Sequence, residues 1–266
     1  ILYVCFNYYH NYKQGIMKRK FGGNVIRSMD INKIGEYYFA SGPYEYYMMV
    51  LENGSSLKVE NLQSFSVYLL DVPEESEIIL AKRGNKLVQG DVIQVEQESI
   101  ELNIVGGKAS FLISGVIESN LDAPNIEITH YEEIYKVNKP WGHELWLNGE
   151  HPSYCFKQIY LKGGLRTSLQ YHNIKQETNV LFKGEAYIHY KSNPEIENFS
   201  VQNNDIDRVK INPISSVDII PGVIHRVESI SDVVLYETST PHLDDVIRIT
   251  DDSNRPDGRI RSEHAS

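Results

Sequence analysis

The chain has 266 residues, of which 41% are hydrophobic and 23% charged, and this balance excludes a disordered or fibrous protein. The length allows one large domain or two of ordinary size. A formal net charge of −10 disfavours contact with a phosphate backbone, so no nucleic-acid partner is expected, and no membrane partner either, because no stretch approaches the roughly 20 apolar residues that span a bilayer.

Residues 1–23 are interpreted as an extension of uncertain status. The apolar residues of 1–16 precede the basic run Lys18, Arg19 and Lys20, which is the reverse of a secretory signal. We therefore hypothesise that translation begins at Met17. Two cysteines, Cys5 and Cys155, cannot build a disulfide framework and favour a reducing, cytoplasmic location.

Residues 24–118 contain short β-like runs separated by turn residues. The segment SIELNIV alternates so that Ile100, Leu102 and Ile104 share one face. Strand spacing of about 8–12 residues is typical of antiparallel sandwiches and barrels, with helix as a minor component. Because the chain has no histidine between His10 and His130, this half is predicted to be a degenerate barrel without an imidazole-based metal site.

The rest of the chain divides into three predicted parts. Residues 119–135 are polar, contain a proline and are interpreted as a connector. The β pattern resumes over 136–248, with a rhythm of strands and glycines similar to that of the first half. We therefore predict an all-β protein of two tandem barrels, followed by an arginine-containing tail over 249–266.

A metal site is predicted in the second barrel. Gln170 and His172 are two residues apart, so on a strand they face the same side, and Glu177 returns after a short turn. His225 follows the tight turn at Pro221 and Gly222. Two imidazoles, one carboxylate and one amide oxygen would bind one divalent metal ion with an open position, whether Zn, Fe, Mn, Co or Ni. The alternative is that these are hydrogen-bonded core or surface side chains.

The spacing of this segment resembles a known family. Gly164, five residues, Gln170, one residue, His172, four residues, Glu177, six residues and Gly184 resemble the first motif of the cupin superfamily, and Pro-Gly-x-x-His at 221–225 resembles the second. This resemblance implies jelly-roll barrels in which Gln170, His172, Glu177 and His225 hold the metal.

Four segments in order resemble the cupin domain of type II mannose-6-phosphate isomerases. They are KPWG with Glu144 over 139–144, LKGGLRTSLQYH over 161–172, IPGVIHR over 220–226, and DDVIRI over 244–249 running on to Arg255. The resemblance covers roughly 136–255. It implies metal-dependent aldose–ketose isomerisation of a phosphorylated sugar, with Arg255 as a catalytic residue that contacts the substrate.

The sequence also departs from that family. Ser253 and Asn254 precede Arg255, where the family usually has Tyr-Gly, and nothing in 1–135 resembles the nucleotide loop of a nucleotidyltransferase. Guanylyl transfer is therefore not expected. The alternatives to an isomerase are another cupin enzyme, such as a sugar epimerase or a metal-dependent oxygenase, and a non-enzymatic sugar-binding protein with two cupin barrels.

Further basic residues are candidates for substrate binding. Lys162 and Arg166 flank the metal-binding strand, and Arg248 belongs with Arg255 to a C-terminal arginine cluster that would attract an anionic substrate. The alternative is that these are solvated surface charges. His189 is either a base or a hydrogen-bonded structural residue. Pairing of exposed sheet edges makes a homodimer the expected assembly.

Overall fold

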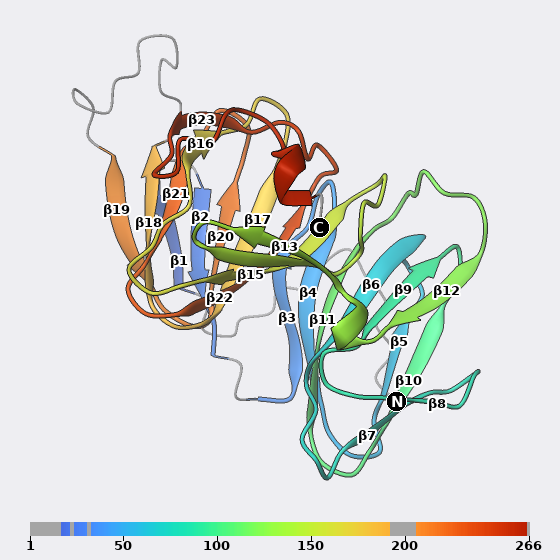
Figure 1. Ribbon diagram of the computed structural model, residues 1–266. Coiled ribbons are helices and arrows are strands. Elements are labelled where there is room, and N and C mark those ends of the chain that lie inside the picture. Colours follow the sequence, from blue (N-terminus) through green and yellow to red (C-terminus); the bar gives the residue numbers. More distant parts are fainter. Residues whose placement is uncertain (1–16, 22–23, 31–32, 192–205, 265–266) are drawn as a thin grey trace. The chain divides into compact units, whose positions relative to one another are not determined.

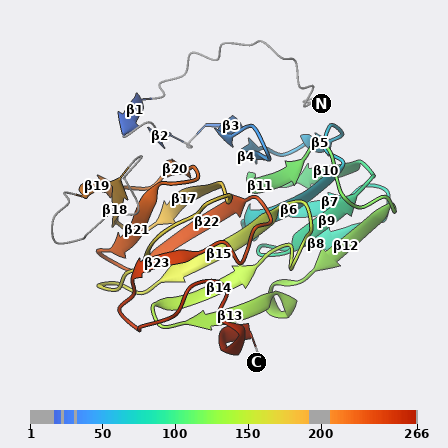
Figure 2. The ribbon, with the colours of Figure 1, turned by 90° about the horizontal axis from the view of Figure 1, so that it is seen from above.

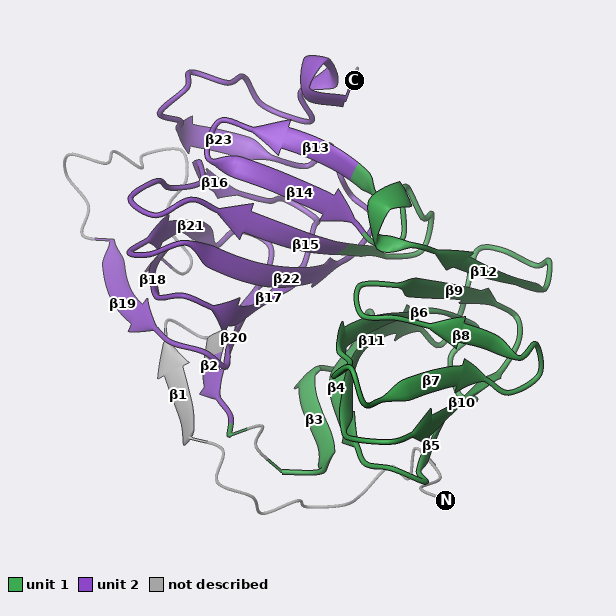
Figure 3. Cartoon of the chain, turned by 60° about the horizontal axis from the view of Figure 1, so that its bottom comes forward, with its two compact units in different colours: residues 1–15, 30–135, 147–156 green, residues 16–29, 136–146, 157–266 purple. Residues whose placement is uncertain are grey.

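The computed structural model describes residues 17–21, 24–30, 33–191 and 206–264. The predictions for residues 1–16, including Cys5 and the hypothesis on the start of translation, concern residues outside this description. The described chain forms two compact units (Figure 3). Unit 1 contains residues 30–135 and 147–156, and unit 2 contains the described residues of 16–29, 136–146 and 157–266.

Unit 1 is built from two sheets of antiparallel neighbours, labelled in Figure 1. The larger has the strand order β12-β9-β6-β11-β4-β3 and the smaller β5-β10-β7-β8. The strands are β3 Gly35–Ala40, β4 Glu45–Leu51, β5 Ser56–Val59, β6 Ser64–Asp71, β7 Glu77–Leu80, β8 Asn85–Leu87, β9 Val92–Glu96, β10 Ile100–Val105, β11 Ala109–Val116 and β12 Asn125–Thr129, followed by the 3-10 helix η1 Tyr131–Glu133.

Unit 2 also has two sheets, with the orders β1-β2-β20-β17-β22-β15-β14-β13 and β19-β18-β21-β16-β23. Its strands are β1 Met17–Phe21, β2 Asn24–Ser28, β13 Tyr135–Lys139, β14 Gly142–Trp146, β15 Cys155–Leu161, β16 Leu169–Tyr171, β17 Glu177–Lys183, β18 Ala186–Lys191, β19 Asp207–Ile211, β20 Ser215–Ile219, β21 Ile224–Ser229, β22 Val233–Ser239 and β23 Ile247–Thr250. The 3-10 helix η3, Arg261–His264, follows the last strand.

The core of each unit lies between its two sheets. In unit 1, Leu102 from the small sheet packs in the same buried cluster as Phe65 and Phe111 from the large one, as the alternation in SIELNIV predicts. In unit 2, Ile188 from β18 shares a cluster with Leu181 and Leu235 from the opposite sheet. The prediction of an all-β protein is confirmed, and the two 3-10 helices in the described residues are short.

The structural units do not follow the predicted boundaries. Strand β2 pairs with β20 of unit 2, although residue 24 was expected to begin the first barrel. The predicted connector contains β12, which pairs with β9, and residues 147–156 belong to unit 1. Strand pairing decides these assignments, and the partner of a strand is not encoded in its local alternation pattern.

The fold also shows the state of Cys155 and the length of the helices. Cys155 is buried and forms no disulfide. Among the described residues, none of the helices has the length and apolar composition needed to span a bilayer.

Candidate metal centre and its cavity

The predicted ligands His172, Glu177 and His225 meet inside unit 2. His172 directly follows β16, Glu177 begins β17, and His225 is the second residue of β21. The Glu177 Oε2 atom lies 3.5 Å from His172 Nε2, and Oε1 lies 3.3 Å from His225 Nε2. All three side chains are buried, and one ligand atom from each falls within 4.8 Å of the others. Among the described residues, these three side chains form a group of His, Cys, Asp or Glu that is close enough to hold a metal ion.

Both imidazoles are oriented by backbone carbonyls. His172 Nδ1 donates to the carbonyl oxygen of Asp245, and His225 Nδ1 donates to that of Val223 at 3.1 Å. Each ring therefore turns the lone pair of its Nε2 atom toward Glu177. Both Nε2 atoms are buried without a hydrogen-bond partner, which is costly for polar atoms unless another group satisfies them. The arrangement fits a divalent metal ion, because a metal-bound histidine commonly donates its other nitrogen in this way.

Gln170 lies beside these ligands. It is the cross-strand partner of His225, and it lines the same cavity as His225 and Glu177. Its position agrees with the expected role as a fourth ligand, which stays a prediction.

Glycines shape the two motifs. Gly222 adopts φ +80°, a backbone conformation that favours glycine, and its N–H donates to the carbonyl of His172 at 2.7 Å. This bond joins the two motifs. At Gly184 a Cβ atom would lie 2.1 Å from the Asp232 carbonyl oxygen, so only glycine fits at the end of β17.

A buried lysine accompanies the ligands. Lys175 Nζ lies 2.5 Å from Glu177 Oε2 and 2.8 Å from Glu237 Oε1, and Asn179 donates to Glu177 Oε1 at 3.0 Å. Burial raises the pKa of Glu177, but the adjacent Lys175 and the imidazoles of His172 and His225 together outweigh burial and hold that pKa well below its usual range. Glu177 is therefore an ionised carboxylate. The sequence reasoning missed Lys175 and Glu237; the only signal for Lys175 was its place between His172 and Glu177.

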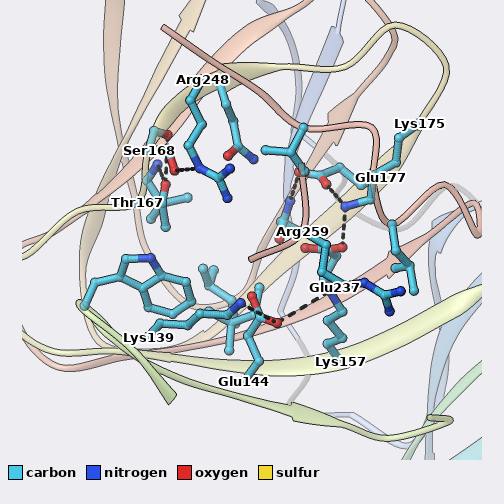
Figure 4. Close-up of a pocket in the computed structure, with 18 of the residues that line it drawn as sticks. Lys139, Glu144, Lys157, Thr167, Ser168, Lys175, Glu177, Glu237, Arg248 and Arg259 are labelled. Atoms are coloured by element: carbon cyan, nitrogen blue, oxygen red, sulfur yellow. Dashed lines mark hydrogen bonds and ion pairs between the residues drawn. The ribbon is translucent and has the colours of Figure 1, made fainter. Parts of the chain in front are cut away.

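A cavity of about 120 Å³ opens beside the ligands (Figure 4). Its walls come from β13 to β18, β21 and β22, and from the segment that follows β22. The charged side chains that line it are Lys139, Glu144, Lys157, Lys175, Glu177, Glu237, Arg248, Arg255 and Arg259. Six of these nine are cationic, and three of the six also pair with carboxylates outside the lining: Arg255 with Asp251, Lys139 with Glu263 and Arg259 with Asp244.

Glu144 anchors one wall of the cavity. Its Oε2 atom lies 3.6 Å from Lys157 Nζ and 3.7 Å from Lys139 Nζ, and it accepts a hydrogen bond from Trp146 Nε1 at 2.9 Å. Burial raises the pKa of Glu144, but Lys157 and Lys139 outweigh burial and lower it to about 2. The carboxylate therefore stays ionised and fixes both lysines beside the cavity.

Two arginines share one hydroxyl on another wall. Ser168 Oγ accepts from Arg248 Nε at 3.1 Å and from Arg255 Nη2 at 3.1 Å. Arg255 is further held by Asp251 at 2.7 Å and by Glu263 at 3.4 Å. The predicted tail residue Arg255 is thus built into the cavity wall.

The other predicted residues lie elsewhere. Arg166 is 44% exposed and forms a two-bond ion pair with Asp252 at 2.7 and 2.9 Å. Lys162 is exposed, and neither Arg166 nor Lys162 lines the cavity. His189 bonds Glu228 at 2.5 Å on the opposite face of β18 from the cavity-lining Ile188, as strand alternation requires.

The protein is similar to known proteins in structure. No family model and no curated protein matches the sequence. Oxalate decarboxylase from Lactobacillus farciminis superposes with TM-score 0.59 and 10% identity over 88% of this chain and 86% of its own. The Escherichia coli protein Ylba gives TM-score 0.62 and 7% identity over 84% and 93%. Salicylate 1,2-dioxygenase from Pseudaminobacter salicylatoxidans gives TM-score 0.55 and 8% identity over 77% and 76%.

At identities of 7–10% these likenesses establish the fold. They extend over both units, because each covers more than three quarters of the chain. The protein therefore has the cupin fold, built as two jelly-roll barrels.

Proposed function

We propose that this protein is a metal-dependent cupin enzyme that interconverts the aldose and ketose forms of a phosphorylated sugar. One observation carries the proposal: Glu177 and His225 of the candidate metal group line a cavity in which Arg248 presents a guanidinium whose direct hydrogen-bond partners are neutral. Such a site would hold an anionic group at one end and the reacting carbons at the other.

In the strand register, Arg248 lies level with Gln170 and His225 across neighbouring strands. Gln170 is the cross-strand partner of both His225 and Arg248, so the three side chains point to one face of the sheet. Two strand spacings separate Arg248 from His225 at the backbone, about 10 Å. A small sugar phosphate spans that distance.

Arg248 has one guanidinium nitrogen, Nη2, without a hydrogen bond among the described residues. Its guanidinium donates to Ser168 Oγ, to the Gly258 carbonyl at 2.8 Å and to the Pro256 carbonyl. Within the described part of the chain these direct partners are all neutral. Because a guanidinium N–H is a strong donor to phosphate, the Nη2 group of Arg248 suits the anionic end of the substrate.

The ligating residues would be His172, Glu177 and His225 with Gln170, and the ion they hold would polarise the carbonyl and adjacent hydroxyl of an open-chain sugar.

Glu237 lines the same cavity, and its Oε1 atom accepts a hydrogen bond from Lys175. Its Oε2 atom has no partner among the described residues. We assign Glu237 Oε2 the role of the base that removes the proton from the sugar carbon and returns it to the neighbouring one.

A coupled assay tests this activity. Protein loaded in turn with Zn, Mn, Fe, Co and Ni is incubated with mannose 6-phosphate, and fructose 6-phosphate is measured, with other hexose phosphates in parallel. Turnover is expected, and Glu237→Gln should lower kcat at least about 100-fold while the metal content stays unchanged. Absence of turnover with every metal and every hexose phosphate would reject the isomerase.

A different metal-dependent cupin reaction is the second candidate. It is favoured by the structural likeness to an oxalate decarboxylase and to a salicylate dioxygenase. Oxygen uptake by the iron-loaded protein would identify an oxygenase. Ligand-induced stabilisation by sugar phosphates without turnover would identify the remaining alternative, a sugar-binding protein.

We also propose a reducing, cytoplasmic location and a homodimeric assembly, both of which are expected from the sequence. Light scattering of the purified chain measures the assembly. A mass of one chain at micromolar concentration would contradict the homodimer.

A further inference from the structure

The C-terminal segment brings an additional carboxylate to the wall of the cavity. Figure 2 shows this segment in red, leaving β23 and ending in η3 beside β13. Glu263 of η3 contacts Lys139 Nζ through Oε2 at 2.8 Å and Arg255 Nη1 through Oε1 at 3.4 Å. Lys139 and Arg255 both line the cavity.

Glu263 bonds the two donor atoms of this wall, Arg255 Nη1 and Lys139 Nζ, that make no other hydrogen bond among the described residues. Arg255 gives its Nε and Nη2 atoms to Asp251 and Ser168, whereas Nη1 is bonded to Glu263. Lys139 Nζ lies 3.7 Å from Glu144, which is beyond hydrogen-bond length, and bonds Glu263 directly. An anionic ligand that approached this wall would need the same two donors.

Glu263 is also held less firmly than the other acids of this wall. Glu144 lies on β14 and accepts from the Trp146 indole, and Asp251 accepts backbone N–H groups from Ser253 and Arg255. In the described residues the Glu263 carboxylate contacts Lys139 and Arg255. It is carried by a four-residue 3-10 helix without a buried residue, so moving it disturbs little of the core.

We propose that Glu263 is an internal counter-anion for an anion subsite formed by Lys139 and Arg255, and that the phosphate or carboxylate group of the ligand displaces it. Without a ligand, Glu263 thereby supplies the counter-charge for these two donors, and ligand binding releases the C-terminal segment from the wall. This inference rests on the proposed anionic substrate, and it adds a competitor from the chain itself.

Isothermal titration with inorganic phosphate tests the inference without requiring turnover or metal. Glu263→Gln keeps the shape of the side chain and removes its charge, so phosphate should bind about 3- to 10-fold more tightly than to the wild type at low ionic strength. Glu132→Gln in η1 of unit 1 is the matched control for the change in net charge and should leave the affinity unchanged. Sulfate in place of phosphate shows whether any compact oxyanion suffices.

A second variant separates the subsite from a general charge effect. Lys139→Met should weaken phosphate binding, and the double variant Glu263→Gln/Lys139→Met should lose most of the gain seen with Glu263→Gln alone. Thermal melting of each variant shows that it is folded, and Glu263→Ala replaces Glu263→Gln if the latter is not.

Equal phosphate affinity for the wild type and Glu263→Gln would overturn the inference. So would a gain of the same size in Glu132→Gln or in the double variant. The inference would also fail if neither the wild type nor any variant bound phosphate. The isomerase proposal fails separately, through the absence of turnover in the metal-loaded wild type. A gain in phosphate affinity without isomerase activity would leave the subsite in place and remove only the assigned reaction.

Discussion

The ammonium of Lys175 and the carboxylate of Glu177 form a buried ion pair, with 2.5 Å between Nζ and Oε2. Glu177 is at the same time the residue between the two histidines, so its charge is balanced by a lysine of the protein before any metal is considered. Lys175 also bonds Glu237, and one cation therefore serves two buried carboxylates. The stability of the barrel and its affinity for a metal are linked through this lysine.

Lys175→Met is expected to destabilise the metal-free protein by about 3 kcal/mol, because both carboxylates would remain buried without a counter-charge. A divalent ion should recover part of the loss, since its charge would replace that of the ammonium. Urea unfolding in EDTA and with added metal measures both effects. Lys162→Met, an exposed lysine of the same barrel, is the control; equal unfolding free energies for the two variants in EDTA would contradict the prediction.

Glu177→Ala and His225→Ala are each expected to reduce metal affinity at least about 10-fold, since each removes a ligand from a closed group of three. Elemental analysis of gently purified protein gives the metal content per chain. His189→Ala, which alters a histidine outside the cavity, should retain the wild-type content. A wild type without near-stoichiometric metal, or ligand variants that keep it, would show that the site does not bind metal.

Glu144 gives a prediction for pH. Its pKa is lowered from 4.5 to about 2 in the folded protein, so its contribution to stability is complete above pH 4.5 and is lost as pH falls toward 2. Glu144→Gln should therefore be less stable than the wild type by about 3 kcal/mol at pH 7, and this difference should shrink between pH 4.5 and 2. Chemical unfolding at pH 7 and pH 3 measures it; a difference independent of pH would show that Glu144 acts through packing alone.

Arg248→Met is expected to raise KM for a sugar phosphate about 10-fold or more with a smaller effect on kcat, because its proposed role is to bind the part of the substrate that does not react. Arg248→Lys should lie between this variant and the wild type, since lysine keeps the charge and loses the paired geometry. Arg166→Met is the matched control, because that guanidinium lies outside the cavity. Equal KM values for the Arg248 and Arg166 variants would remove Arg248 from the binding site.

Local sequence and the resemblance to the cupin motifs predicted the fold class and the group His172, Glu177 and His225. Alternation along β10 and β18 defined which side chains are buried, because a strand shows one face to the core. The spacing of His172, Glu177 and His225 left a hydrogen-bonded core or surface role open, and the resemblance to the two cupin motifs is what favoured a metal site there.

What only the tertiary structure decided depends on contacts between segments far apart in the chain. Strand β2 belongs to unit 2 because it pairs with β20, and the C-terminal segment is part of the site because Glu263 contacts Lys139, 124 residues earlier. Lys175 and Glu237 became significant only when folding buried them against Glu177. The sequence by itself determined the β-barrels and pointed to the group His172, Glu177 and His225. The partners of each charge, and with them the charges that line the cavity, were decided by the strands and loops that the fold places side by side.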